Sequence, residues 1–150
     1  MTPKKIICID PGKNGGVAFR SPAGEVHAVA MPETVHDLAD LLFYELTFPL
    51  ESVEAVVERV HSMPSDAASA AFAFGENFGA VQGVLASLRI PYRFVNPHQW
   101  QKKVGTLPKD KPERKRALKA FAQQRYPHIK VTLKTADALA MLAVETEGAS

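Results

Sequence analysis

The sequence predicts an α/β fold in which a mixed five-stranded sheet is flanked by helices on both faces. Three short apolar segments, separated by turns rich in Gly, Pro and Asn, open the chain and are typical of an antiparallel meander. Two later apolar segments are each followed by helical patterns, as expected of parallel strands joined by right-handed crossovers. The five predicted strands span residues 5–10, 17–20, 26–30, 53–57 and 92–95.

The helices are predicted from their capping residues and from apolar residues at helical spacing. Thr34 is expected to cap the first helix, because Asp37 follows three residues later. A long helix is expected to open at Pro64-Ser65-Asp66, and its apolar stripe indicates core packing. That stripe consists of Phe74, Phe78, Val81, Leu85 and Leu88.

Three segments complete the predicted order of elements. Residues 96–107 are expected to form a polar connection that is in part helical. A helix over about 112–125 begins with a proline, which suits a first helical turn. Thr135 is expected to cap a last helix that runs to about Glu147.

Length and composition narrow the class of protein. A chain of 150 residues has the length of one domain with a continuous core, so we expect a single domain over residues 1–150. The composition, 46% hydrophobic and 23% charged, excludes collagen-like, disordered and disulfide-scaffold proteins. The longest apolar run, Ala138–Val144, is far shorter than the roughly 20 residues of a membrane span, and no signal-peptide core is present. With Cys8 as a single, buried thiol, we expect a cytoplasmic protein without membrane contacts.

Charge is distributed unevenly along the chain. Residues 1–75 carry 5 Lys and Arg against 10 Asp and Glu, whereas residues 76–150 carry 13 against 6. Residues 101–120 alone contain eight basic side chains. This pattern predicts a surface that faces a polyanion beside an acidic region, although a basic, solvated helix face would give the same count.

Asp10 is the first residue with a functional signature. It ends a strand that is apolar on both faces, where an ionised carboxylate is costly unless something binds it. The segment Pro11–Gly16 follows, and its glycines allow backbone amides and a phosphate to approach closely. The structural alternative is that Asp10 caps this turn.

Glu58 repeats the pattern after the apolar strand 53–57. If this strand and the first one are parallel neighbours, Asp10 and Glu58 emerge at the same carboxyl edge of the sheet, where α/β proteins place their ligands. A structural salt bridge, for example with Arg59, is the alternative.

Asp137 lies in the first turn of the last predicted helix. It shares a stripe with Ala140, Met141 and Val144, so its carboxylate is expected to point toward the protein. A favourable interaction with the helix dipole is the structural alternative.

Three converging carboxylates would form an oxygen-rich site for Mg²⁺ or Mn²⁺ rather than for zinc. The sequence contains no phosphate-binding P-loop and no nucleophile elbow, and we expect no organic cofactor. Two metal ions about 3.5–4 Å apart could activate water and stabilise the leaving oxygen in phosphodiester hydrolysis. The basic segment 102–119 would then hold a phosphate backbone.

Three motifs in this order resemble the RuvC-like Holliday junction resolvases, and most closely their short bacteriophage-type members, within the ribonuclease H-like nuclease superfamily. The motifs are Ile9-Asp10-Pro11-Gly12, Val57-Glu58-Arg59-Val60 and Ala136-Asp137-Ala138-Leu139-Ala140. The resemblance covers nearly the whole chain. It implies a ribonuclease H-like fold and a homodimeric, metal-dependent endonuclease that cuts opposed strands of a four-way DNA junction in the cytoplasm of a bacterial or phage-infected cell.

The resemblance also assigns roles to residues. Asp10, Glu58 and Asp137 match metal-binding carboxylates of the family, with two ions per site. Lys134 stands where the family usually has a further acidic residue or His, three positions before the last Asp. We expect Lys134 either to contact the scissile phosphate as a catalytic residue or to lie exposed at the start of the helix.

Further residues are expected to contact DNA. The family inserts an aromatic side chain at the junction centre, and Phe72 is the better candidate because Phe74 suits the core. Trp100 could stack on a base or anchor the chain, and anchoring is favoured. The basic candidates are Lys13, Lys102, Lys103, Lys109, Lys111, Arg114, Lys115 and Arg116.

Three other functions remain open at this point. The chain could cut branched DNA more broadly, such as flaps and forks, or bind junctions without cutting them, as Lys134 suggests. The glycine-rich turn after Asp10 also suggests an actin-like or sugar-kinase-like ATPase, but those folds need two such domains and 150 residues leave no room for the second.

Overall fold

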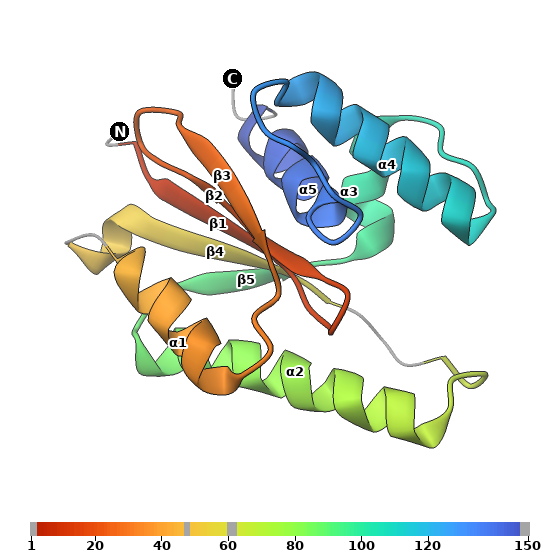
Figure 1. Ribbon diagram of the computed structural model, residues 1–150. Coiled ribbons are helices and arrows are strands. Elements are labelled where there is room, and N and C mark those ends of the chain that lie inside the picture. Colours follow the sequence, from red (N-terminus) through yellow and green to blue (C-terminus); the bar gives the residue numbers. More distant parts are fainter. Residues whose placement is uncertain (1–2, 47–48, 60–62, 148–150) are drawn as a thin grey trace.

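A five-stranded sheet with strand order β3-β2-β1-β4-β5 forms the centre of the computed structural model, which describes residues 3–46, 49–59 and 63–147. The strands β1, β2 and β3 pair antiparallel, whereas β4 runs parallel to β1 and β5 parallel to β4. The predicted mixed sheet is therefore confirmed (Figure 1). The strands are β1 (Lys5–Asp10), β2 (Gly16–Arg20), β3 (Val26–Ala30), β4 (Val53–Glu58) and β5 (Tyr92–Val95).

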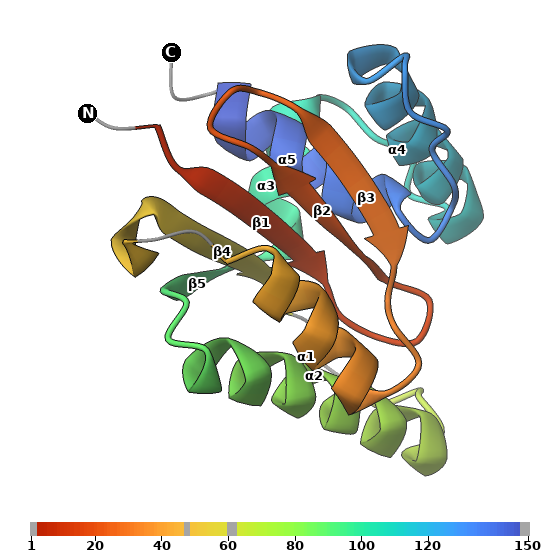
Figure 2. The ribbon, with the colours of Figure 1, turned by 60° about the vertical axis from the view of Figure 1, so that its left-hand side comes forward.

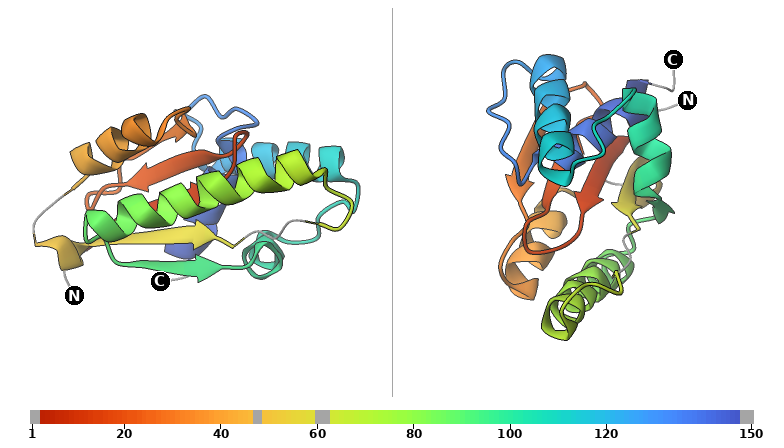
Figure 3. Two further views of the ribbon diagram at one scale, coloured as in Figure 1. Left: turned by 90° about the horizontal axis from the view of Figure 1, so that it is seen from below. Right: turned by 90° about the vertical axis from the view of Figure 1, so that its right-hand side faces the viewer.

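Helices cover both faces of the sheet, as predicted. Figures 2 and 3 show α1 and α2 against one face, and α3, α4 and α5 on the other. A short 3₁₀ turn, η1 (Leu50–Ser52), precedes β4. The helices are α1 (Val35–Tyr44), α2 (Ala68–Ser87), α3 (Pro97–Val104), α4 (Lys111–Arg125) and α5 (Ala136–Glu147).

The alternation of side chains along β1 builds two cores. Ile7 and Ile9 pack into the core beneath α1 and α2, whereas Cys8 joins the core beneath α5. All three side chains are fully buried, which explains why the strand is apolar at every position. Burial raises the pKa of the Cys8 thiol, so Cys8 is the inert, buried residue expected from the sequence.

The predicted helix start is correct for α1 and wrong for α2. Thr34 caps α1 as predicted, because its Oγ1 accepts a hydrogen bond from the Asp37 amide at 3.0 Å. The predicted start of the long helix is wrong by one turn, because α2 begins at Ala68. The carboxylate of Asp66 instead accepts a hydrogen bond from the Met63 amide at 2.7 Å and stabilises a preceding turn.

The start of α5 also departs from the expected cap. The Thr135 carbonyl accepts the first helical hydrogen bond, from the Leu139 amide at 3.0 Å. Its hydroxyl, however, accepts from the Thr132 amide at 3.1 Å, so it stabilises the turn before the helix and not the helix amides. The connection 96–107 is in part helical as predicted, and the Asn96 amide donates to Gln99 Oε1 at the start of α3.

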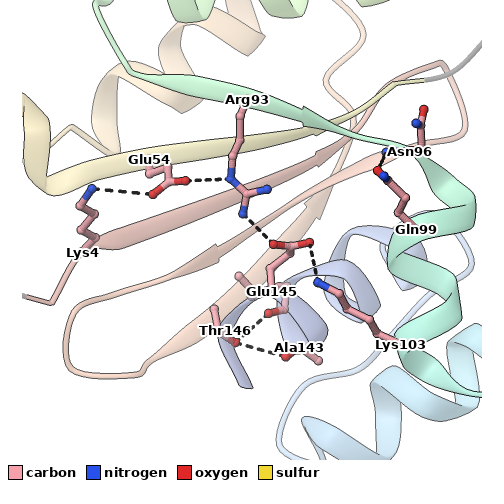
Figure 4. Close-up of polar contacts among 10 residues, drawn as sticks. Lys4, Glu54, Arg93, Asn96, Gln99, Lys103, Ala143, Glu145 and Thr146 are labelled. Carbon is pink, nitrogen blue, oxygen red and sulfur yellow. Dashed lines mark hydrogen bonds and ion pairs between the residues drawn. The ribbon is translucent and has the colours of Figure 1, made fainter. Parts of the chain in front are cut away.

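An ion-pair network ties the edge strand β5 to α5 (Figure 4). Arg93 Nε lies 3.0 Å from Glu54 Oε1, and its Nη2 lies 2.6 Å from Glu145 Oε2. Lys4 Nζ lies 3.8 Å from Glu54 Oε2, and Lys103 Nζ lies 3.9 Å from Glu145 Oε1. These contacts link β4, β5, α3 and α5 to one another.

None of the helices in the described part of the chain has the length and apolar character needed to cross a membrane.

Candidate active site

The three acidic residues singled out in the sequence lie near one another at one edge of the sheet. Asp10 is the last residue of β1 and Glu58 the last of β4. Because Ile9 pairs with Val57 in the parallel register, Asp10 and Glu58 follow as neighbours at the carboxyl edge. Asp137 reaches the same place from the first turn of α5, which packs on β1 and β2.

Burial and mutual repulsion set the protonation of this group. Asp10 is 7% exposed, and burial, followed by the negative charges of Glu58 and Asp137, raises its pKa well above the usual value. Glu58 is 6% exposed, and burial raises its pKa to about 7. A hydrogen bond from Trp100 lowers the pKa of Glu58, and the charge of Asp137 raises it. Asp10 and Glu58 therefore lie close enough to each other and to Asp137 for these groups to change their pKa values.

Trp100 positions Glu58. Its indole is 1% exposed in α3, and its Nε1 donates a hydrogen bond of 2.5 Å to Glu58 Oε2. The anchoring role favoured in the sequence is thus correct, because a buried ring cannot stack on a base. The sequence did not indicate that the anchored partner would be a site carboxylate.

Lys115 provides a cation at the site. Its Nζ lies 3.0 Å from Asp137 Oδ1, and its charge lowers the pKa of both Asp10 and Glu58. Among the described residues, Asp137 Oδ1 stands out as a buried side-chain oxygen that accepts no hydrogen bond, so the ion pair with Lys115 is its main compensation.

The loop after Asp10 is fixed by α2. The Gly12 amide donates to Asn77 Oδ1 at 2.6 Å, and Gly12 has φ +109°, which favours glycine. A Cβ at Gly12 would lie 3.0 Å from the Phe74 ring, and one at Gly15 would lie 1.9 Å from the Asp10 carbonyl oxygen. The predicted glycine-rich turn is therefore held tightly against Asp10.

A pocket of about 410 Å³ opens beside this loop. Its walls are the loop itself, the start of α2, and the side chains of Asp10, Lys115 and Asp137. Phe74 lines it as well, so its ring is half-buried at the site and does not lie in the core where the sequence placed it. Val81 and Leu85, further along the same stripe, are fully buried as predicted.

The donor set fits a hard divalent cation. Carboxylate oxygens are the ligands that Mg²⁺ and Mn²⁺ prefer, and Asp137 Oδ1 is a buried oxygen without a hydrogen bond. Within the described ranges, however, no three His, Cys, Asp or Glu side chains converge closely enough to hold one ion. Asp10, Glu58 and Asp137 are the carboxylates that would hold such an ion, and the ammonium of Lys115 is paired with Asp137.

The remaining predicted site residues lie around this edge. Lys134 and Lys13 are exposed, Lys134 just before α5 and Lys13 in the loop that lines the pocket. Phe72 is 71% exposed near the start of α2. Of the basic candidates, Arg114 and Lys115 are half-buried, and those with exposed side chains are Lys102, Lys103, Lys109, Lys111 and Arg116.

A second, more open pocket of about 380 Å³ lies between the end of α3 and the start of α4. Lys102, Lys109 and Arg114 line it, which groups three of the predicted DNA contacts in one place. Arg114 Nη1 donates to the Lys109 carbonyl at 3.0 Å and so fixes this connection. Lys103 points elsewhere, toward Glu145 (Figure 4).

The sequence did not indicate that Asn77 positions the loop after Asp10, nor that Glu58 is the partner of Trp100. Asn77 lies 65 positions from Gly12, and Trp100 lies 42 positions from Glu58. For Asn77, the available signal was a polar side chain in the middle of a mostly apolar helix. For Trp100, the signal was an indole, which needs a hydrogen-bond acceptor when it is buried.

The sheet order and the helices on both faces define the RuvC-like, ribonuclease H-like fold. The chain is similar to a structure of T. thermophilus RuvC in complex with a Holliday junction substrate, with 16% identity, a TM-score of 0.64, and coverage of 97% of this chain and 94% of that one. A second Thermus thermophilus RuvC structure shares 19% identity, with a TM-score of 0.52 and coverage of 97% and 96%. At this identity the likeness establishes the fold, and it confirms the fold predicted from the three motifs. No protein-family model and no curated protein matches the sequence.

Proposed function

We propose that this protein is a metal-dependent, structure-selective DNA endonuclease that resolves four-way Holliday junctions. The observation that carries the proposal is the meeting of Asp10 and Glu58 at the ends of adjacent parallel strands, with Asp137 beside them. A RuvC structure of the same fold is a complex with a Holliday junction substrate. The whole described chain would act as one nuclease domain in the cytoplasm of a bacterial or phage-infected cell.

In this proposal, Asp10, Glu58 and Asp137 hold Mg²⁺ or Mn²⁺, with two ions per site. The bound metal would activate water and stabilise the leaving oxygen of a phosphodiester. Trp100 would keep Glu58 oriented toward the site through its hydrogen bond. Lys134, exposed at the start of α5, would contact the scissile phosphate.

Branched DNA would lie across α3, α4 and the start of α2. The exposed lysines and arginines of this region supply phosphate contacts, which position a duplex without reading its sequence. Phe72, exposed on α2, would stack on an unpaired base at the junction centre.

Paired cuts on opposed strands require two active sites, and α2 offers a surface for a second copy. Gly75, Gly79 and Gly83 are spaced four apart on its exposed side. A Cβ on any of them would meet nothing within 4 Å in this chain, although each glycine costs a helix about 1 kcal/mol relative to alanine. Close approach of another helix would account for them. Gly79→Leu should shift the sedimentation coefficient from that of a dimer to that of a monomer. A variant that still sediments as a dimer would show that α2 is not part of the interface.

A cleavage assay tests the proposal against its alternatives. Four-way junction, flap and plain duplex of equal length are incubated with purified protein in Mg²⁺ or in EDTA, and nicks are mapped on every strand. We expect paired, symmetric nicks in the four-way junction, and we expect them only in Mg²⁺ and not in EDTA. Comparable cleavage of flaps would indicate a broader branched-DNA nuclease. Junction binding without nicking would indicate a binding module, the function that Lys134 and the incomplete convergence of the carboxylates favour.

A further inference from the structure

Lys115 occupies an unusual position for a basic residue of a DNA-binding helix. It lies in α4 with its side chain 31% exposed, and its Nζ is 3.0 Å from Asp137 Oδ1. The exposed lysines of the same helix, such as Lys111, project to solvent instead. Lys115 also lines the pocket that contains Asp10 and Asp137.

Electrostatics explain why a cation is needed there. Asp10 and Glu58 are almost completely buried, and Asp137 adds a third carboxylate close enough to raise the pKa of both. Buried charges of one sign are costly unless a charge of the opposite sign lies among them. Because Asp137 Oδ1 is buried and accepts no hydrogen bond, the ammonium of Lys115 is what compensates it.

We propose that Lys115 is a positioning residue that serves as the built-in counter-ion of the metal-free site and must withdraw from Asp137 when a divalent cation binds. This inference deepens the proposed function and rests on it. Lys115 and the metal cannot both hold Asp137 Oδ1, so the lysine weakens metal binding by the free protein.

The position of Lys115 also suggests where its ammonium moves. The pocket beside it is bounded by the glycine-rich loop, and the exposed Lys13 of that loop also lines it. A DNA phosphate in this pocket would give the ammonium a new partner and release Asp137 to the metal. Metal and DNA would therefore strengthen each other's binding, and by linkage the coupling must be reciprocal.

Calorimetric titration with Mn²⁺ tests this inference without any measurement of cleavage. The variant is Lys115→Met, which removes the charge and keeps the length of the side chain. The matched control is Lys119→Met, one helical turn further along α4. We expect Lys115→Met to bind Mn²⁺ about tenfold more tightly than the unmodified protein, since an ammonium close to the metal position opposes binding, and Lys119→Met to bind as the unmodified protein does.

Thermal unfolding in EDTA provides a second measurement. Lys115→Met should unfold at a lower temperature than the unmodified protein, because its carboxylates lack a counter-ion. Mn²⁺ should remove this difference in unfolding temperature. Lys115→Arg keeps the charge and should resemble the unmodified protein in both measurements. Failure of Lys115→Met to fold even in Mn²⁺ would show a purely structural ion pair and would contradict the inference.

The outcomes separate this inference from the proposed function. If Asp10→Asn abolishes Mn²⁺ binding while Lys115→Met leaves the affinity unchanged or lower, the inference is wrong and the metal site stands. If the unmodified protein and Lys115→Met both fail to bind Mn²⁺, the proposed metal dependence is wrong and the inference falls with it.

Discussion

Trp100 and Glu58 form a buried hydrogen bond that links α3 to the carboxyl edge of the sheet. The indole Nε1 donates to Glu58 Oε2 at 2.5 Å, and both side chains are nearly inaccessible to solvent. This bond favours the ionised form of Glu58, against burial and the charge of Asp137. A residue outside the acidic group therefore controls the protonation of one of its members.

Trp100→Phe should shift the pH dependence of metal-assisted activity. The substitution removes the hydrogen bond that lowers the pKa of Glu58, so this pKa should rise above about 7. Because a carboxylate must be ionised to hold a metal, the pH of half-maximal junction cleavage in Mg²⁺ should move upward by about one unit. Tyr126→Phe, a change in the same core, is the control for lost stability. Equal pH profiles for both variants would show that the bond does not control Glu58.

Glu58→Gln should stabilise the metal-free protein at alkaline pH. The pKa of Glu58 rises from 4.5 to about 7 on folding, so the folded state binds more protons in this interval. The free energy of unfolding therefore falls as pH rises from about 4.5 to 7, and a neutral amide avoids that loss. In EDTA at pH 8 we expect a gain of about 1–3 kcal/mol, shrinking toward zero at pH 5. Thermal unfolding at both pH values checks this, and a destabilised variant at pH 8 would contradict it.

Phe72→Ala should weaken junction binding without affecting the fold. The ring is 71% exposed, so its removal should change the free energy of unfolding by less than about 0.5 kcal/mol. Loss of one stacked base should cost about 1–3 kcal/mol of binding to a four-way junction. Binding is measured in Ca²⁺ at fixed salt, with plain duplex for comparison. Phe43→Ala, which removes a ring that is 55% exposed on α1, is the control and should bind normally. Equal binding by both variants would exclude Phe72 from the interface.

Arg93→Met should destabilise the protein, because it leaves Glu145 with only the more distant Lys103 as a partner. The Glu145 side chain is 9% exposed and lies 2.6 Å from Arg93 Nη2 (Figure 4). We expect a loss of about 2–3 kcal/mol, limited by the exposure of Arg93 and by Lys103 nearby. The double variant Arg93→Met/Glu145→Leu should recover most of this loss. Urea unfolding of the three proteins measures it, and additive losses in the double variant would mean that the pair is not coupled.

Local patterns in the sequence were sufficient for the arrangement of the sheet and for the placement of Asp10 and Glu58 at one edge of it. The apolar run before Asp10 identifies a buried strand, and a charged residue at its end is a local anomaly that needs no knowledge of packing. Glu58 follows by the same reasoning, and their proximity follows from parallel pairing. The likeness to RuvC structures confirms the resulting fold.

Local sequence patterns could not predict contacts between segments that are distant in the sequence. The bond between Trp100 and Glu58 and the ion pair between Lys115 and Asp137 depend on how α3 and α4 pack on the sheet and on α5. Lys115 was predicted from the sequence to contact DNA, and the resemblance made it one of four candidates, with Lys102, Lys103 and Lys111, for a lysine that assists the chemistry. Nothing near Lys115 in the sequence indicates its acidic partner. Phe74 was assigned to the core because it shares an apolar stripe with Phe78, Val81 and Leu85. Those three residues do pack into the core, whereas Phe74 lies one turn closer to the start of α2 and lines the pocket instead.

The central claim is that Asp10, Glu58 and Asp137 act together on a bound divalent cation to hydrolyse DNA. The most direct measurement compares the unmodified protein with Asp10→Asn on a four-way junction whose four strands are labelled separately, in Mg²⁺. The account predicts that Asp10→Asn binds the junction with unchanged affinity in EDTA and produces no nicks, whereas the unmodified protein cuts two opposed strands. Nicking by Asp10→Asn at the unmodified rate would contradict it.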